Sequence, residues 1–137
     1  MFISIYTDGG SRGNPGVSGV GVVVYSDDKI IFQLSQYLGI KTNNEAEYTA
    51  LLLALKWLLD QKDILKIEKA NFFLDSQLIV RQMQGLYKVK APNLKHFFQE
   101  AQKLVQLISI PIVFKDIPRE QNTVADSLAN IAMDRKI

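Results

Sequence analysis

The stretch from Phe2 to Gly16, FISIYTDGGSRGNPG, constrains the fold more than any other part of this chain. It begins as a run of β-forming residues and then becomes rich in glycine and proline, which weaken a strand. We therefore expect the first strand to end at Asp8, with a glycine-rich loop after it. In open α/β sheets, ligands bind at the carboxyl ends of strands, and such a loop lets a polyanion approach backbone N–H groups. The alternative is that Asp8-Gly9-Gly10 is only a turn.

The composition restricts the class of protein without deciding its function. The chain has 137 residues, 47% of them hydrophobic, which is enough for one domain, residues 1–137, with a core that needs no covalent cross-links. It contains no cysteine, which excludes a disulfide framework, a thiolate metal site and a thiol nucleophile. We see neither a signal-peptide pattern nor a membrane-spanning run, so we expect a cytoplasmic protein that does not enter membranes. Sixteen basic and fourteen acidic residues permit a nucleic-acid partner without requiring one.

The rest of the chain predicts strands first and then alternating helices and strands. Two β-branched runs, Gly19–Tyr25 and Lys29–Tyr37, are joined by a short polar segment and predict a hairpin. A helix is expected over Asn43–Asp60, with Asn43 or Asn44 as its N-cap. The later expected elements are a strand over Ala70–Leu74, helices over Ser76–Gln84 and Asn93–Leu107, a strand over Ile110–Ile117 and a helix over Asn122–Arg135. This order predicts an α/β fold with a mixed sheet and helices on both faces.

The predicted elements place four acidic residues. Asp8 and Asp75 each follow a predicted strand, so their carboxylates meet at one edge of the sheet if the two strands are parallel neighbours. Two like charges that close repel unless a cation or a proton intervenes. On the first predicted helix, Glu47 lies at the border of the apolar arc and is directed towards the sheet, whereas Glu45 lies on the solvated face.

Asp126 is harder to place from the pattern. It lies in the opening turns of the last predicted helix, away from an apolar stripe formed by Val124, Leu128 and Ile131. An acid at that position is also explained by the helix dipole. Periodicity alone therefore leaves its role open.

Four short motifs occur along the chain, and together they are more informative than any one of them alone. They are Thr7-Asp8-Gly9-Gly10 with Gly13-Asn14-Pro15-Gly16, then Thr42-Asn43-Asn44-Glu45-Ala46-Glu47, then Asp75-Ser76-Gln77, and finally Asn122-Thr123-Val124-Ala125-Asp126-Ser127-Leu128-Ala129. In this order and spacing they resemble the type 1 ribonuclease H family, and the resemblance covers essentially the whole chain. It implies a ribonuclease H-like fold with a five-stranded mixed sheet. It also implies metal-dependent endonucleolytic cleavage of the RNA strand of an RNA/DNA hybrid, leaving 5′-phosphate and 3′-hydroxyl ends.

The resemblance also implies roles for individual residues. Asp8, Glu47, Asp75 and Asp126 correspond to the catalytic acids and would hold two Mg²⁺ or Mn²⁺ ions. Carboxylates without soft ligands suit such hard cations, and two ions about 4 Å apart can activate a water and neutralise a leaving oxygen. Small polar groups and backbone amides can contact phosphate and 2′-OH groups without reading the bases. The substrate contacts implied in this way are Gly9, Gly10, Ser11, Arg12, Asn14, Thr42, Asn43, Asn44 and Gln77.

Two segments depart from the fuller family pattern. Some members carry a long basic insertion where this chain has only Gly85–Lys95, so its affinity for a hybrid is expected to be modest or to be supplied by a partner. Many members place a histidine before the last helix, whereas this chain has Pro118-Arg119-Glu120. We expect Arg119 to be catalytic by holding a phosphate, because a guanidinium stays protonated and cannot act as a base. We expect a monomer, and a non-catalytic hybrid-binding module of the same fold remains the alternative.

Overall fold

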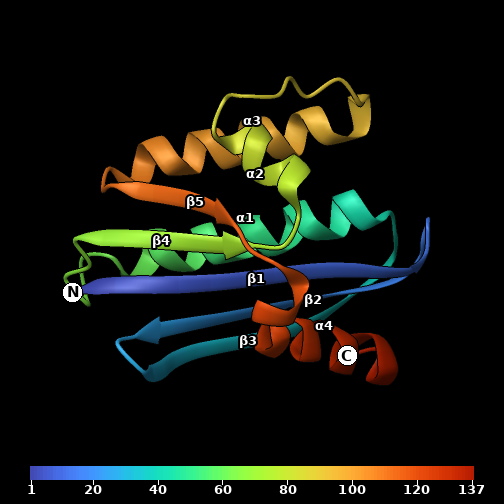
Figure 1. Cartoon of the computed structure of the whole chain (residues 1–137), viewed down its shortest axis with the longest axis horizontal. Coiled ribbons are helices and arrows are strands. Elements are labelled where there is room, and N and C mark those ends of the chain that lie inside the picture. Colours follow the sequence, from blue (N-terminus) through green and yellow to red (C-terminus); the bar gives the residue numbers. More distant parts are fainter.

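The computed structural model describes all 137 residues, which form one five-stranded sheet and four α-helices (Figure 1). The strands lie in the order β3-β2-β1-β4-β5. β1 pairs antiparallel with β2, and β2 with β3, while β4 and β5 run parallel to β1. The bounds are β1 Phe2–Gly13, β2 Gly16–Ser26, β3 Lys29–Lys41, α1 Asn43–Gln61, β4 Lys69–Leu74, α2 Gln77–Met83, α3 Pro92–Ile108, β5 Ile112–Asp116 and α4 Thr123–Arg135. The predicted mixed sheet is confirmed.

The glycines after Asp8 do not end the first strand, so that expectation was wrong. β1 continues along β2 as far as Gly13, and the turn is confined to Asn14 and Pro15. Glycine weakens a strand, but it keeps both backbone hydrogen-bonding groups, and a neighbouring strand can satisfy them. The other neighbour of β1, β4, ends at Leu74. β1 therefore runs past the end of β4, and Asp8 lies at this step in the sheet.

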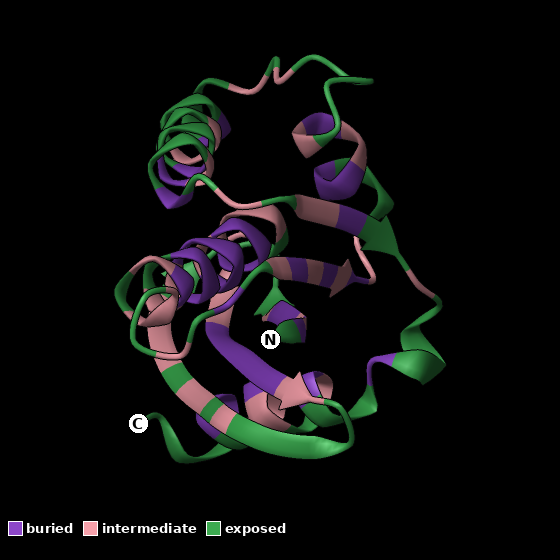
Figure 2. Ribbon diagram, turned by 90° about the vertical axis from the view of Figure 1, so that its left-hand side faces the viewer, coloured by how far each residue is buried: buried purple, intermediate pink, exposed green.

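Helices cover both faces of the sheet, as expected. α1 packs on β1 and β2 with α3 beside it, and α4 packs across β2 and β3 on the opposite face (Figure 1). The main core lies between the sheet and α1, where Ile3, Ile5, Leu51, Leu55 and Leu58 are fully buried (Figure 2). No helix combines the length and apolar character needed to cross a membrane. The site described below lies where the rigid sheet and α1 meet at the end of β4.

The face of α4 that meets the sheet differs from the predicted apolar stripe. Val124 and Ile131 are 38% and 40% exposed, while Leu128, the third residue of that stripe, is half-buried next to Gly21. The residues fully covered by the sheet are mostly alanines, namely Ala125, Ala129 and Ala132 with Met133. The helix lies so close to β2 that a Cβ on Gly21 would stand 2.1 Å from the Ala125 carbonyl oxygen. Small residues on both elements therefore determine which face of α4 is buried, and this selection is invisible to a search for large apolar side chains.

Candidate active site

Three carboxyl groups meet at the step where β4 ends. Asp8 follows the last β1 residue that pairs with β4, and Asp75 directly follows β4 itself. Glu47 reaches them from α1, and one oxygen from each side chain lies within 4.8 Å of the other two. Asp8 and Glu47 are only 4% and 7% exposed. The predicted meeting of Asp8 with Asp75, and the predicted inward direction of Glu47, are confirmed.

The position of Glu47 depends on the close approach of α1 to β1. Gly9 lies directly under the first turn of the helix, where a Cβ would stand 2.2 Å from the Ala46 carbonyl oxygen. With no side chain in the way, the Gly9 N–H donates to Glu47 Oε1 at 3.0 Å. Gly9 thus holds a carboxylate of the cluster in place, a role that the resemblance did not imply for it.

Glu45, two residues earlier on α1, has a structural task. The N-cap of α1 is Thr42, so the expectation of Asn43 or Asn44 was wrong. The Thr42 hydroxyl accepts from the Glu45 N–H at 3.1 Å, and Glu45 Oε1 accepts from the Thr42 N–H at 2.9 Å, which completes a capping box. The hydrogen bond from the Thr42 backbone lowers the pKa of Glu45. The sequence alone does not distinguish Thr42 from Asn43 and Asn44, because threonine and asparagine are both good N-cap residues.

Asp126 joins the cluster from the first turn of α4. Its carboxyl group is near enough to raise the pKa of Asp8, and it lines the same cleft as Asp8 and Glu47. Asp8 therefore lies between Asp126 on one side and the pair formed by Glu47 and Asp75 on the other. All four predicted acids are brought together.

Asn122, immediately before α4, is a site residue whose role was not predicted. It is 1% exposed, and its Nδ2 donates to the Thr7 carbonyl oxygen at 2.9 Å and to Asp75 Oδ2 at 3.2 Å. Its side chain makes no capping hydrogen bond to α4. An asparagine before a helix is by default interpreted as a cap, so the pattern concealed that Asn122 ties α4 to the ends of β1 and β4.

Burial raises the pKa of two of the acids. Burial raises the pKa of Asp8 from 3.8 to about 7. The neighbouring Glu47 carboxyl group opposes the rise, while the charges of Asp75 and Asp126 add to it. Burial, followed by the charge of Asp8, raises the pKa of Glu47 well above its usual value. Glu47 Oε2 is buried and has no hydrogen-bond partner. At neutral pH the cluster thus favours either bound protons or a compensating cation.

The acids open into a cleft of about 520 Å³. Its lining includes Asp8, Glu47, Asp126 and, at its mouth, Arg119, together with six of the predicted substrate contacts: Gly9, Gly10, Ser11, Arg12, Asn43 and Asn44. Arg119 is exposed in a short 3₁₀ turn and forms no ion pair. The predicted placement of Arg119 at the mouth of the site is therefore confirmed.

The other predicted substrate contacts lie at or beyond the rim of this cleft. Asn14 Oδ1 accepts from the Asn43 N–H at 3.1 Å, which fixes the β1–β2 turn against the start of α1. Thr42 is committed to the capping box, and Gln77 is exposed in the first turn of α2. Arg12, which lines the cleft itself, is held by α4, because its guanidinium lies 2.6 Å from the Asp134 carboxylate.

Comparison with known proteins identifies the family. The chain matches a family model described as reverse transcriptase-like over residues 6–132. It is 33% identical to the Ribonuclease H of Ruthia magnifica, in an alignment that covers 97% of this chain and 96% of the relative. This chain belongs to the ribonuclease H family. It is also 42% identical to proteins of Mycobacterium bovis and Mycobacterium tuberculosis over 98% of its length, but it spans only 36% of theirs.

Solved ribonuclease H structures have the same architecture. LC11-RNase H1, solved in complex with an RNA/DNA hybrid, superposes with a TM-score of 0.91 at 46% identity, covering 98% of each chain. RNase H1 from the archaeon Halobacterium salinarum gives a TM-score of 0.88 at 34% identity, covering 98% of this chain and 99% of the other. The predicted family and the predicted ribonuclease H-like fold are both confirmed.

The residues of this ribonuclease H site fit a divalent cation. Every candidate ligand is a carboxylate oxygen, which hard ions such as Mg²⁺ and Mn²⁺ prefer over soft ones. A cation would also satisfy the buried Glu47 Oε2 and replace the protons that burial and mutual repulsion favour in the cluster. The acidic cluster is therefore able to hold metal.

Proposed function

We propose that this chain is a metal-dependent endonuclease that hydrolyses the RNA strand of RNA/DNA hybrids and leaves 5′-phosphate and 3′-hydroxyl ends. The observation that carries the proposal is the cluster of Asp8, Glu47, Asp75 and Asp126 beside an open cleft that Asp8, Glu47 and Asp126 line. Similar proteins support it: those of Ruthia magnifica and Halobacterium salinarum are named ribonucleases H, and LC11-RNase H1 was solved with a hybrid bound.

The four acids divide naturally between two ions. Asp8, in the middle, would be the shared ligand, with Glu47 and Asp75 holding one ion and Asp126 the other. Two Mg²⁺ or Mn²⁺ ions, when bound, would supply an activated water and neutralise charge on the leaving 3′ oxygen. Gly9 and Asn122 fix the orientation of Glu47 and Asp75, so the ligand set is rigid before substrate arrives.

The cleft is suited to a sugar–phosphate backbone. The side-chain amides of Asn43 and Asn44, which line the cleft, can donate to phosphate and 2′-OH groups without contacting base edges. The Ser11 N–H already donates to Asn43 Oδ1 at 2.9 Å, which holds this wall of the cleft together. Cleavage should therefore depend on the sugar and the helix shape more than on base sequence. A monomeric state and a cytoplasmic location stay predictions from the sequence.

A cleavage assay tests the function directly. A hybrid with end-labelled RNA should be cut internally when Mg²⁺ or Mn²⁺ is present and should stay intact in excess chelator. The matching DNA duplex should stay intact in both conditions. The alternative, a non-catalytic module, predicts that the hybrid is retained in a binding assay but remains whole at every metal concentration.

Replacing Arg119 with alanine is expected to lower kcat by about ten- to a thousand-fold with little change in KM. The reason is that an unpaired guanidinium at the mouth of the cleft can offset charge as the 3′ oxygen leaves. Lysine should restore part of the rate, since it keeps the charge but not the bidentate geometry. Arg135→Ala, at an exposed arginine outside the cleft, is the control. A normal kcat with a raised KM in Arg119→Ala would mean that Arg119 only helps the hybrid to bind.

Hybrid binding is expected to weaken steeply with salt, and Lys88→Ala and Lys90→Ala should each lower the slope of log K against log salt by about 0.9. Both lysines are exposed in the segment after α2, and Lys88 lines a hollow with Tyr87 and Lys95. Lys29→Ala, at the far end of the sheet, should leave the slope unchanged. Binding isotherms at several salt concentrations measure this slope for each variant. Unchanged slopes in both loop variants would exclude this segment from the interface.

A further inference from the structure

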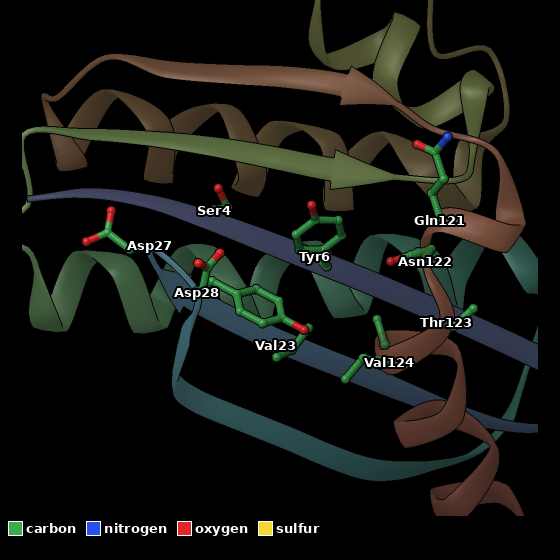
Figure 3. Close-up of a pocket in the computed structure, with 11 residues that line it drawn as sticks. Ser4, Tyr6, Val23, Asp27, Asp28, Gln121, Asn122, Thr123 and Val124 are labelled. Carbon is green, nitrogen blue, oxygen red and sulfur yellow. The ribbon is translucent and has the colours of Figure 1, made fainter.

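A second pocket lies on the α4 face of the sheet (Figure 3). Its volume is about 330 Å³, and it shares no lining residue with the catalytic cleft. Tyr6 and Tyr25 contribute to its wall, Asp27 and Asp28 come from the β2–β3 turn, and Asn122 lies at the start of α4. None of the functions discussed above uses this pocket.

One wall of the pocket is aromatic. The rings of Tyr6 and Tyr25 meet edge to face, with centroids 5.6 Å apart and an interplanar angle of 85°. Tyr6 is held in place from its other side by stacking on Phe73, with centroids 4.8 Å apart. Electron-rich ring faces fixed in this way attract cations.

The mouth of the pocket is acidic. Asp27 and Asp28 are exposed in the hairpin turn, and neither forms an ion pair. No lysine, arginine or histidine lines the pocket. The charge therefore opposes a phosphate or a nucleic-acid strand and favours a positively charged ligand.

Asn122 supplies an independent sign of a missing hydrogen-bond donor. Its Nδ2 already serves two acceptors, the Thr7 carbonyl and Asp75, which fixes the opposite end of the amide as oxygen. That oxygen, Oδ1, is buried without a partner, and in Figure 3 it points towards Tyr6. A ligand N–H group at the inner end of the pocket would supply the hydrogen bond that Oδ1 lacks.

We propose that this pocket binds a primary alkylammonium group, either the end of a linear polyamine or a lysine side chain of another protein. The ammonium group would lie against Tyr6 and Tyr25 and donate towards Asn122 Oδ1, and the negative charge of Asp27 and Asp28, at the other end of the pocket, would attract it (Figure 3). The same Asn122 amide holds Asp75, so the ligand site and the catalytic cluster contact opposite ends of one side chain. The proposal concerns binding alone and stands whether or not the chain cleaves hybrids.

Titration of ¹⁵N-labelled protein with 1,4-diaminobutane tests the site. Mg²⁺ in excess keeps the amine away from the catalytic carboxylates. We expect saturable shifts of the Asn122 side-chain amide and of the Tyr6 and Tyr25 backbone signals. Neutral 1,4-butanediol should cause none, and tetramethylammonium, which has no N–H donor, should bind more weakly. A lysine blocked at both backbone ends distinguishes the sources: tighter binding than the diamine points to a protein side chain, and weaker binding to a polyamine.

Substitution of the two acids separates this site from non-specific attraction. Asp27 has φ of 54°, a conformation that asparagine also adopts readily, so the double variant Asp27→Asn, Asp28→Asn should keep the turn. Its dissociation constant for 1,4-diaminobutane should rise about tenfold or more. Asp60→Asn, at an exposed acid of α1 on the other face of the sheet, is the matched control and should bind normally. The proposal is overturned if the diamine causes no saturable shifts, if the diol causes the same ones, or if the double variant binds as well as the control.

Discussion

Replacing Asp8 with asparagine is expected to abolish metal-dependent cleavage, by about a thousand-fold or more, while making the metal-free protein more stable at neutral pH. Asp8 lies between Asp126 and the other two acids, so its loss removes the ligand that both ions would share. Losing several kcal/mol of metal-ion stabilisation corresponds to three or more powers of ten in rate. The assay is single-turnover cleavage of a labelled hybrid. An Asp8→Asn enzyme that cleaves normally would refute the site assignment.

The stability of the metal-free protein should depend on pH through the same residue. The pKa of Asp8 is 3.8 in the unfolded chain and about 7 in the folded one, so the folded state binds the proton more tightly. Its contribution to stability is fully present below pH 3.8 and is lost as pH rises towards 7. At about 1.4 kcal/mol per pKa unit, the loss reaches up to about 4 kcal/mol. Asparagine carries no titrating proton, so the variant should lack this loss.

Chemical denaturation in chelator at pH 5 and pH 8 measures this effect. The free energy of unfolding of the wild type should fall between the two pH values by more than that of Asp8→Asn. The exposed-acid control Asp60→Asn should follow the wild type. Added Mg²⁺ should restore the wild type at pH 8 and help Asp8→Asn less. Parallel pH curves for wild type and Asp8→Asn would mean that this carboxyl group is not perturbed.

The parts of the site that could be predicted are those that depend on regular geometry. Asp8 and Asp75 were expected to meet because acids that follow parallel neighbouring strands share one sheet edge. The direction of Glu47 followed from the helical period, which separates it from Glu45 by about 200°. In both cases the argument needed only the type of element and the position of the residue within it.

The parts that could not be predicted depend on contacts between distant segments. β1 runs past Asp8 because β2 forms hydrogen bonds with its backbone as far as Gly13. The local glycine pattern does not indicate that β2 pairs with this segment. The buried face of α4 is determined by the fit of Ala125 against Gly21, and Val124 and Ile131 stay exposed. Asn122 has the sequence position of a helix cap, but its amide is used by Thr7 and Asp75.

Substituting Glu47 with glutamine is expected to lower cleavage by about a hundred-fold or more, whereas Glu45→Gln should leave it nearly unchanged. Both changes replace a carboxylate with an amide of the same shape on the same turn of α1. At position 47 the amide oxygen can still accept from the Gly9 N–H, so α1 should stay in place while the ligand charge is lost. At position 45 the amide oxygen can still accept from the Thr42 N–H, so the capping box should survive.

The two variants are each other's control, because they differ in which side of α1 carries the change. Glu47→Gln should also bind Mg²⁺ more weakly, as measured by calorimetry. In chelator at neutral pH it should unfold at a higher denaturant concentration than the wild type, because it removes a buried group whose pKa is raised by burial and by Asp8. Glu45→Gln should lose only the attraction of its charge for the start of the helix, about 0.3–1 kcal/mol, and bind Mg²⁺ normally. Equal losses of cleavage would mean that both carboxylates serve the reaction. Equal Mg²⁺ affinities with unequal cleavage would instead give Glu47 a role in contacting substrate, outside the set of metal ligands.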